Sequence, residues 1–296
     1  MILGIDRAWR CHAIKNIAEV FIMVDRSGKS LSPLEAKAIQ AEAIQEKAGL
    51  RGVVYGTGGI GKTSLCALLS KYGRTVILDL DRSLNILKAQ FEAQGLDDIV
   101  SIPVSSFPEL IDVLHLSGWD DVKNIVIDSA TRVEELIAKH VLKTVSTEKG
   151  LFVKSIEDYG YGKGYVFIYD AFLRLLDELE VFLWSGVNVI FTAHDCVVNV
   201  PNPNGDDWIR YEPRLQSPPS GKSSIRQRVK EWADIMAFLS YDMSVDRKGK
   251  AKAKGTRTIY PFEQSFCMAK TRIPIDVMPY DEGSAEFWNI LFGGTK

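Results

Sequence analysis

A glycine-rich stretch at residues 56–63 constrains the fold of this chain more than any other feature. It fits the pattern G-x-x-x-x-G-K-S/T, whose glycines reach backbone angles that a Cβ atom would forbid, so that successive amides can point at one anion. The lysine of the pattern adds a point charge, and its threonine hydroxyl suits Mg²⁺, which prefers oxygen ligands. The residues that we expect to bind the phosphates of a nucleotide are Gly56, Thr57, Gly58, Gly59, Ile60, Gly61, Lys62, Thr63 and Ser64.

The residues on either side of this stretch fit a strand and a helix. Residues 52–55 form a short apolar run that is typical of a buried strand. Residues 63–72 predict a helix whose positive end faces the anion, and Gly73 suits the position just after its last turn. Because strand, loop and helix follow one another in the order that a P-loop requires, a chance glycine-rich turn explains the sequence poorly.

Composition places the chain among soluble globular proteins. It has 296 residues, 46% hydrophobic and 25% charged, which allows one large domain or two small ones. A net charge of −2 gives no global attraction to nucleic acid or membranes, so such contacts must come from local patches. We expect a cytoplasmic protein without membrane contact, because neither a long apolar span nor a secretory signal is present. The scattered cysteines, which indicate reduced thiols, are Cys11, Cys66, Cys196 and Cys267.

The first part of the chain, residues 1–49, shows no clear hydrophobic period. Ser32, Pro33 and Glu35 together provide an N-cap, a proline at the first helical position and a capping-box glutamate, which predicts a helix to about Lys47. We interpret this part as a partly helical extension. It is either an oligomerisation arm or, as we prefer, a poorly ordered segment translated from an upstream start codon. The nucleotide-binding domain then spans residues 50–296.

From residue 50 onward, apolar strands alternate with helices. Buried strands are expected at 75–81, 122–129 and 187–195, and each ends in polar residues. Such a pattern is typical of an α/β fold with a mainly parallel sheet, helices on both faces and ligands at the carboxyl ends of the strands. A mobile loop is expected at 150–165. Further elements are predicted as helices at 85–94, 107–116, 133–145, 167–184 and around 226–230, and as a strand at 235–241, a lysine-rich hairpin at 247–255 and returning strands at 256–261 and 266–275.

Acidic and histidine side chains at the strand ends are candidate catalytic residues. Asp128 follows the apolar run 125–127 in a Walker B pattern, where a carboxylate would hold a water bound to Mg²⁺. Asp79 and Asp81 end the second strand, and we favour Asp81 for orienting the attacking water, with helix capping as the alternative. His194 ends the fourth strand and would reach the terminal phosphate, although a lone histidine is more often structural. Thr63 and Asp128 are therefore the predicted metal site.

Lys270 and Arg272 alternate on a predicted strand and so would face the same side. Two cations there could reach a nucleotide bound to a neighbouring subunit, as an arginine finger supplied in trans. The alternative is a solvated strand edge that is protected by its positive charges. The predicted catalytic residues are Lys62, Asp81, Asp128, His194 and Arg272.

The order of these motifs resembles the RecA-like ATPase core, in which Asp-Ser is the usual Walker B ending and a Lys-x-Arg pair acts across the subunit interface. Residues 50–275 also resemble phage AAA-domain nucleotide-binding proteins, including single-strand annealing ATPases of the Sak type. The resemblance implies a RecA-like P-loop NTPase fold with a C-terminal β-hairpin region, the cofactors ATP and Mg²⁺, a homo-oligomer, and the host cytoplasm as location. The stretches that carry it are 53–56, 127–129, 158–160 and 191–194.

Four positions depart from related families. The RecA-like base is usually Glu where this chain has Asp81, and the sensor is often Gln where it has His194. Ser129 stands where AAA+ motors carry a second acid, and Thr57 where ParA/MinD-type ATPases carry a lysine. These departures bear on the hydrolysis rate more than on nucleotide binding, and they separate the chain from AAA+ motors and from ParA/MinD-type ATPases.

The resemblance also implies that the loops after the third and fourth strands contact single-stranded DNA. Residues 146–165 contain three tyrosines suited to base stacking, and 197–225 and 247–254 supply cations for phosphates. We therefore expect a Mg²⁺-dependent ATPase that acts in DNA recombination or single-strand annealing. A nucleotide-dependent switch or scaffold that binds a protein partner is the alternative. A small-molecule kinase with Arg226 and Arg228 in its lid is a third reading, without a visible acceptor-binding signature.

Overall fold

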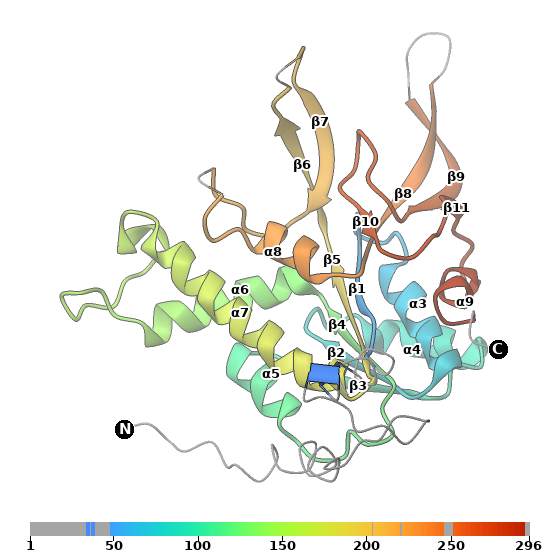
Figure 1. Ribbon diagram of the computed structural model, residues 1–296, viewed down its shortest axis with the longest axis horizontal. Helices are drawn as coiled ribbons and strands as arrows, with labels where there is room; N and C mark the ends of the chain where they lie inside the picture. Colours follow the sequence, from blue (N-terminus) through green and yellow to red (C-terminus); the bar gives the residue numbers. More distant parts are fainter. Residues whose placement is uncertain are drawn as a thin grey trace.

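A mixed β-sheet forms the middle of the molecule, with helices packed on both of its faces (Figure 1). The computed structural model describes residues 34–35, 37–38, 48–202, 204–219, 221–245 and 251–293, and the nine-stranded sheet belongs to this part. Most of the predicted N-terminal extension and residues 246–250 of the lysine-rich hairpin lie outside it. Of the helix predicted from Ser32, the described residues 34–35 and 37–38 are helical.

The parallel strands match the apolar runs of the sequence. Strands predicted at 52–55, 75–81, 122–129, 187–195 and 235–241 are confirmed, and a parallel edge strand at 99–103 adds to them. The edge strand has a mixed, partly exposed side-chain pattern and so gave no apolar run. In order across the sheet, the parallel strands are β3 (Ile99–Pro103), β2 (Thr75–Asp79), β4 (Asn124–Asp128), β5 (Asn188–Ala193), β1 (Arg51–Gly56) and β8 (Ile235–Val245).

Antiparallel strands extend the sheet beyond β8. They are β9 (Ala251–Tyr260), β10 (Lys270–Thr271) and β11 (Met278–Pro279). The predicted strand 266–275 was wrong in its length. The backbone of Phe266 and Met268 pairs with Tyr211 (N···O distances of 2.7 and 2.8 Å), so the start of this segment is bonded away from β8.

Helices cover both faces, as the sequence predicted, because neighbouring residues of each buried strand point to opposite sides. Val53 and Tyr55 pack into one apolar cluster with α5, α6 and α7, whereas Val54 packs into a second with α3, α4 and α9. The helices are α3 (Lys62–Ala67) continued by η1 (Leu68–Tyr72), α4 (Leu84–Ala93), α5 (Phe107–Leu114), α6 (Ala130–Thr144), α7 (Lys163–Trp184), α8 (Ile225–Trp232) and α9 (Glu286–Phe292).

The segment predicted as a mobile loop, residues 150–165, is structured in part. It contains the 3₁₀ turn η2 (Glu157–Tyr159) and the start of α7. Tyr159 is buried, and its hydroxyl donates to the carbonyl oxygens of Val141 (3.1 Å) and Val145 (2.6 Å) at the end of α6. The glycines that suggested mobility therefore serve as turns around an anchored tyrosine.

A hairpin that the sequence did not predict stands out from the sheet (Figure 1). It consists of β6 (Asp195–Val200) and β7 (Trp208–Pro213) and begins directly after His194. Residues 201–207, of which the structure describes all but residue 203, lie between its strands. Their Asn, Pro and Gly residues led us to expect an irregular loop instead.

Candidate nucleotide-binding site

The glycine-rich loop connects the buried strand β1 to the helix α3, as predicted. Gly61 precedes the helix with φ 103°, a backbone angle that residues with a Cβ rarely adopt. A Cβ atom at Gly61 would also lie 2.8 Å from Cε1 of Tyr280. Both the backbone angle and the close contact therefore require glycine at this position.

Lys62 lies across the mouth of this loop. Its Nζ atom donates to the carbonyl oxygens of Gly56 and Thr57, each at 2.9 Å, and only 7% of the residue is exposed. Burial lowers the pKa of Lys62, and the nearby carboxylates, Asp128 first among them, oppose this effect. Phosphate oxygens entering the loop would replace two neutral carbonyl acceptors with charged ones, which form stronger hydrogen bonds with an ammonium group.

Asp128 meets the loop from the end of β4. The Thr63 hydroxyl donates to its Oδ2 atom at 2.7 Å, and the Thr192 hydroxyl donates to Oδ1. Burial raises the pKa of Asp128, while the two threonine hydrogen bonds act in the opposite direction. The two residues predicted to bind a metal, one from a helix and one from a strand end, are thus in direct contact.

The oxygen atoms of Thr63 and Asp128 fit a hard divalent cation. Among the described residues, no group of three or more His, Cys, Asp or Glu side chains could hold a metal ion. A cation at this position would therefore take further ligands from water and from the nucleotide phosphates. This is the usual arrangement for Mg²⁺ in phosphate-transferring sites.

The two acids after β2 have different roles in the structure. Asp79 is buried and accepts hydrogen bonds from the backbone amides of Ser83 and Leu84, each at 3.1 Å, at the start of α4. Asp81 instead accepts a hydrogen bond from Ser129 Oγ at 2.8 Å. Asp79 therefore has the helix-capping role, and Asp81, which does not cap a helix, remains available to the candidate site.

His194 lies next to Asp81, with Nε2 3.9 Å from Oδ2 of the carboxylate. Its backbone amide donates to Oγ1 of Thr131 at 3.1 Å, which fixes the end of β5 against α6. Burial and the positive charge of Lys62 lower the pKa of the ring, so it is neutral at pH 7. Lys62, Asp81, Asp128 and His194 are thus gathered at one edge of the sheet.

A polar cavity of about 370 Å³ adjoins this group. Asp81, Arg82, Ser105 and Arg132 line its polar side, and Arg82 donates to the Ser105 hydroxyl at 2.9 Å. The cavity lies beyond the carboxyl ends of β2 and β3, which is where ligands bind in open α/β sheets.

Arg272 lies at the opposite edge of the sheet. Its Nη1 atom is 2.7 Å from Oδ1 of Asp234, which also accepts from the backbone amide of Arg51 at the start of β1. The length of a six-residue strand, roughly 17 Å, separates this edge from the loop. Arg272 is therefore outside the nucleotide site of its own subunit, and a role at a neighbour's nucleotide stays a prediction.

Lys270 has a structural role. Its Nζ atom donates to the backbone carbonyls of Lys230 and Glu231, each at 2.9 Å, in the last turn of α8. A lysine in this position satisfies carbonyls that have no partner within the helix.

Thr192 is a site residue that the sequence analysis missed. It is fully buried in the apolar run of β5, and its hydroxyl donates to Asp128. A buried polar side chain requires a partner, so a threonine among Val, Ile and Phe near the end of a strand was the signal that could have revealed it.

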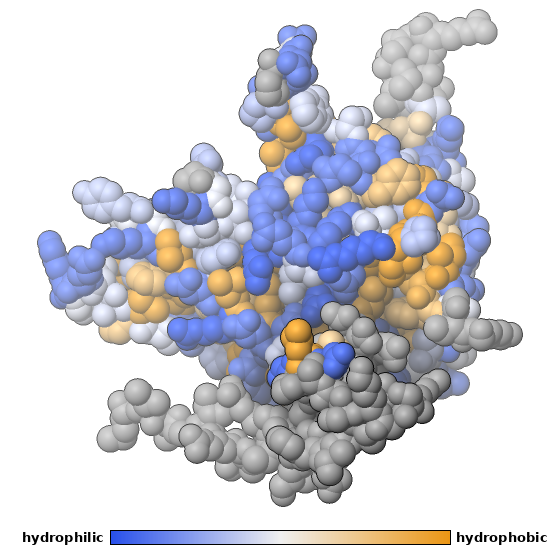
Figure 2. Space-filling view, in the orientation of Figure 1, coloured by the Kyte–Doolittle hydropathy of each residue, from blue (hydrophilic) through white to orange (hydrophobic). Residues whose placement is uncertain are grey.

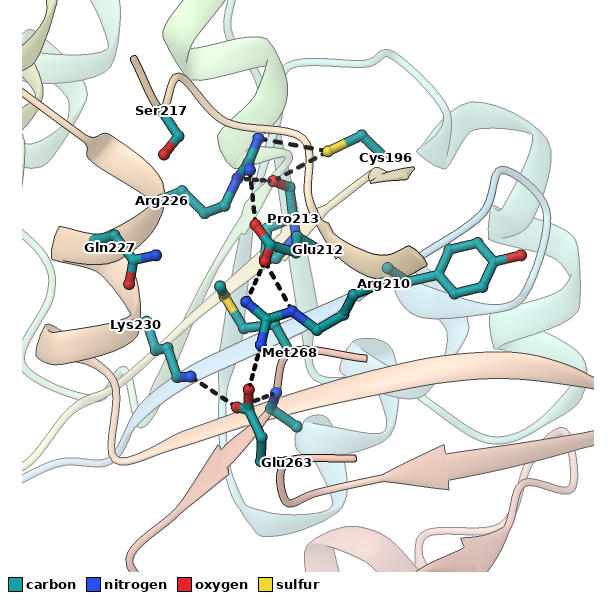
Figure 3. A network of polar contacts seen from close by, with 12 residues as sticks. Cys196, Arg210, Glu212, Pro213, Ser217, Arg226, Gln227, Lys230, Glu263 and Met268 are labelled. Atoms are coloured by element: carbon teal, nitrogen blue, oxygen red, sulfur yellow. Dashed lines mark hydrogen bonds and ion pairs between the residues drawn. The ribbon is translucent and has the colours of Figure 1, made fainter. Parts of the chain in front are cut away.

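Charged side chains fix the base of the β6–β7 hairpin (Figure 3). Glu212 is 3% exposed and accepts from Arg210 Nε at 2.9 Å and from Arg226 Nη1 at 2.7 Å. Arg210 and Lys230 also bind the two carboxylate oxygens of Glu263, each at 2.7 Å. The hairpin that begins beside His194 is thereby connected to α8 and to the segment after β9.

The fold and the gathered loop, threonine and carboxylate define a P-loop nucleotide-binding protein of the α/β RecA-like type. A family model described as "AAA domain" matches residues 48–273, so the chain belongs to this family and contains a nucleotide-binding ATPase domain. No curated protein matches the sequence. In the described part of the chain, none of the helices has the length and apolar character needed to cross a bilayer.

Proposed function

We propose that the protein binds ATP together with Mg²⁺ and hydrolyses it. The contact between Thr63 of the loop and Asp128 of β4, with Lys62 across the loop mouth, carries this proposal. Lys62 would exchange its carbonyl partners for phosphate oxygens, and the loop amides would bind the remaining phosphate charge. When bound there, Mg²⁺ would neutralise the negative charge that develops on the phosphate oxygens during transfer.

Asp81 and His194 have separate roles at the terminal phosphate in this proposal. Asp81 accepts a hydrogen bond from the attacking water and orients it. Asp79 cannot do so, because its carboxylate oxygens already accept hydrogen bonds from the backbone amides at the start of α4. His194, neutral at pH 7, would hydrogen-bond the terminal phosphate without adding charge. Since β6 begins at the next residue, loss of that phosphate would be transmitted to the β6–β7 hairpin.

We further propose that Arg272 acts in trans within a homo-oligomer. Its exposed side chain lies at the edge of the sheet opposite its own loop, so a head-to-tail arrangement of subunits would bring it to the next nucleotide. In a 1:1 mixture of Arg272→Ala and Lys62→Ala subunits, we expect roughly a quarter of wild-type turnover, because that fraction of interfaces combines an intact loop with an intact arginine. The rate should be measured with the solution mass of each sample.

The control for this mixing experiment is each variant alone at the same total concentration. Both are expected to turn over ATP slowly, while Arg272→Ala retains ATP binding. A mixture whose rate equals the average of the two separate rates would exclude action in trans.

Single-stranded DNA is the proposed partner of the oligomer, and the tertiary structure changes which residues would bind it. Tyr159 is buried and unavailable for stacking, whereas Tyr161 is fully exposed. The β6–β7 hairpin carries the exposed aromatic residues Trp208 and Tyr211 and begins at the site. Exposed aromatic side chains on a hairpin that begins next to the candidate nucleotide site are suited to stacking on unpaired bases.

Trp208→Ala is therefore expected to weaken binding of single-stranded DNA about tenfold, since base stacking on an aromatic ring contributes roughly 1–3 kcal/mol. The measurement is a salt titration of DNA binding with and without ATP, together with the ATPase rate with and without DNA. The matched control is Trp184→Ala, because Trp184 is also exposed but ends α7 at the other edge of the sheet. No DNA binding by the wild-type protein at low salt would exclude this partner.

The second candidate is a nucleotide-dependent switch that binds a protein. Val197 and Ile209 are 59% and 65% exposed on the hairpin, and Figure 2 shows apolar residues on its stem below a hydrophilic end. Exposed apolar side chains of this kind favour a protein surface over a nucleic acid. Retention of one protein partner in an ATP-dependent pull-down, without nucleic acid, would select this alternative.

A further inference from the structure

Side chains from the last third of the chain bind the outer surface of the nucleotide-binding loop. In the described residues, three successive carbonyl oxygens of the loop, at positions 59–61, each accept a hydrogen bond from such a side chain. The contacts are Tyr241 Oη to Gly59 O (3.3 Å), Arg257 Nη1 to Ile60 O (3.0 Å) and Tyr280 Oη to Gly61 O (2.9 Å). We call these three side chains the carbonyl clamp.

The clamp contributes to where the amides of the loop point, together with the hydrogen bond that Leu65 N of α3 donates to Gly61 O (2.8 Å). A trans peptide unit is planar, and its N–H and C=O bonds point in opposite directions. When the carbonyls of residues 59–61 are held outward, the amides of residues 60–62 point to the inner side of the loop. These amides are part of the set that a P-loop offers to phosphate.

The clamp is itself fixed in place. The Arg257 guanidinium lies 4.6 Å from the centre of the Tyr280 ring and forms an ion pair with Glu282 at 3.3 Å. Tyr280 is 3% exposed, and burial raises the pKa of its hydroxyl, which therefore keeps the proton that it donates. Trp288 of α9 adds a 2.6 Å hydrogen bond to the carbonyl of Leu65 in the helix that follows the loop.

The position of the loop that requires glycine coincides with the clamp. Gly61 has φ 103°, and a Cβ atom there would meet both Tyr280 and Arg257 within 3.0 Å. The loop is thus packed directly on the clamp. Two of the side chains involved, Tyr280 and Trp288, lie beyond residue 273, where the family match ends.

We propose that Tyr241, Arg257 and Tyr280 are positioning residues that hold the loop peptides in the orientation needed for phosphate. This inference rests on the proposed function in one respect, because it takes the anion to be the phosphate chain of ATP. The affinity of the site then depends on β8, on β9 and on Tyr280, which directly follows β11, as well as on the glycine-rich sequence itself.

Tyr280→Phe tests the proposal because it removes one hydroxyl and keeps the packed ring. It is expected to weaken binding of ATP and of inorganic triphosphate by about three- to tenfold each, the value of one hydrogen bond. Equal losses for the two ligands are expected because the clamp acts on the phosphates. Calorimetric titration gives both affinities, and steady-state kinetics should show a higher KM with a smaller change in kcat.

Further variants separate positioning from a general loss of stability. Arg257→Lys keeps a hydrogen-bond donor, so it should weaken ATP binding less than Arg257→Met does. Tyr241→Phe removes a hydroxyl from a half-exposed residue, where little effect on the stability of the fold is expected. The matched control is Tyr72→Phe, which removes a tyrosine hydroxyl that contacts Ala285 and Asn289 of the same C-terminal segment but no loop carbonyl. Its affinity for ATP should equal that of the wild type.

Two outcomes would contradict the proposal in different ways. If wild-type protein binds ATP and the Tyr280, Arg257 and Tyr241 variants bind it equally well, the clamp does not position the loop, while the proposed function stands. If the wild-type protein binds neither ATP nor triphosphate, both the clamp's role and the proposed function are wrong. The proposal would also be overturned if Tyr72→Phe lowered the affinity for ATP as much as Tyr280→Phe does.

Discussion

Lys62→Ala is expected to abolish ATP binding and to lower turnover at least about 100-fold, the order of loss that follows removal of one donor that stabilises charge developing in a transition state. The side chain is the loop's only point charge, and it already lies across the loop mouth on the carbonyls of Gly56 and Thr57. Equilibrium titration with ATP measures the first effect, and phosphate release measures the second. Unaltered turnover would exclude the assignment of the site.

Two comparisons sharpen this experiment. Lys71→Ala removes an exposed lysine from η1, close to the same helix, and should leave binding and turnover unchanged. Asp81→Asn should lower turnover but retain ATP binding, because Asp81 is proposed to orient water and does not hold phosphate. A loss of binding in Asp81→Asn would place this residue in the phosphate site and not at the water.

Asp128→Asn is expected to lower turnover at least about 100-fold and, without nucleotide, to raise the thermal unfolding midpoint. Burial raises the pKa of Asp128 in the folded protein, so its charge costs stability at pH 7. Asparagine keeps the shape and can still bond to Thr63 and Thr192 without this cost. Loss of activity with a gain in stability is a combination that damage to the fold cannot produce.

The pH dependence of this stability difference has a definite sign. The folded-state pKa of Asp128 is raised above its unfolded value of about 4, so the cost of the charge is fully present above the folded pKa. As the pH falls through that pKa toward about 4, the carboxyl takes up a proton and the advantage of Asp128→Asn should disappear. Thermal unfolding of both proteins between pH 4 and pH 8 measures the difference between their midpoints. A midpoint of Asp128→Asn below that of the wild type at pH 7 would contradict the prediction.

Candidate site positions could be predicted where a local pattern implies a chemical requirement. The glycine-rich loop, Thr63 and the acid after the apolar run 125–127 were assigned from sequence, and Thr63 and Asp128 are in contact. Their meeting follows from a general property of parallel sheets, whose strands all end at the same edge. A role for Arg272 in trans was inferred from its spacing and stays a prediction. Its ion pair with Asp234, just before β8, could not be inferred from the sequence.

Other assignments needed contacts between residues far apart in the chain. Asp79 and Asp81 look alike in sequence, and only the position of α4 shows that Asp79 is its cap. Tyr159 lies among glycines, which suggested a mobile loop, yet its hydroxyl reaches the end of α6. The hairpin at 195–213 was hidden by the turn residues between its strands, although β-branched and aromatic residues on both sides were a usable signal.

The sequence by itself determined the class of fold and the phosphate-binding loop, because apolar runs, glycine positions and strand ends act over short distances along the chain. The tertiary structure decided which acid faces the site, which tyrosine is buried and which side chains hold the loop from outside. The contact between Tyr280 and Gly61 joins residues more than 200 positions apart. Such contacts depend on how β8, β9 and β11 extend the sheet, and no local pattern in the sequence encodes that arrangement.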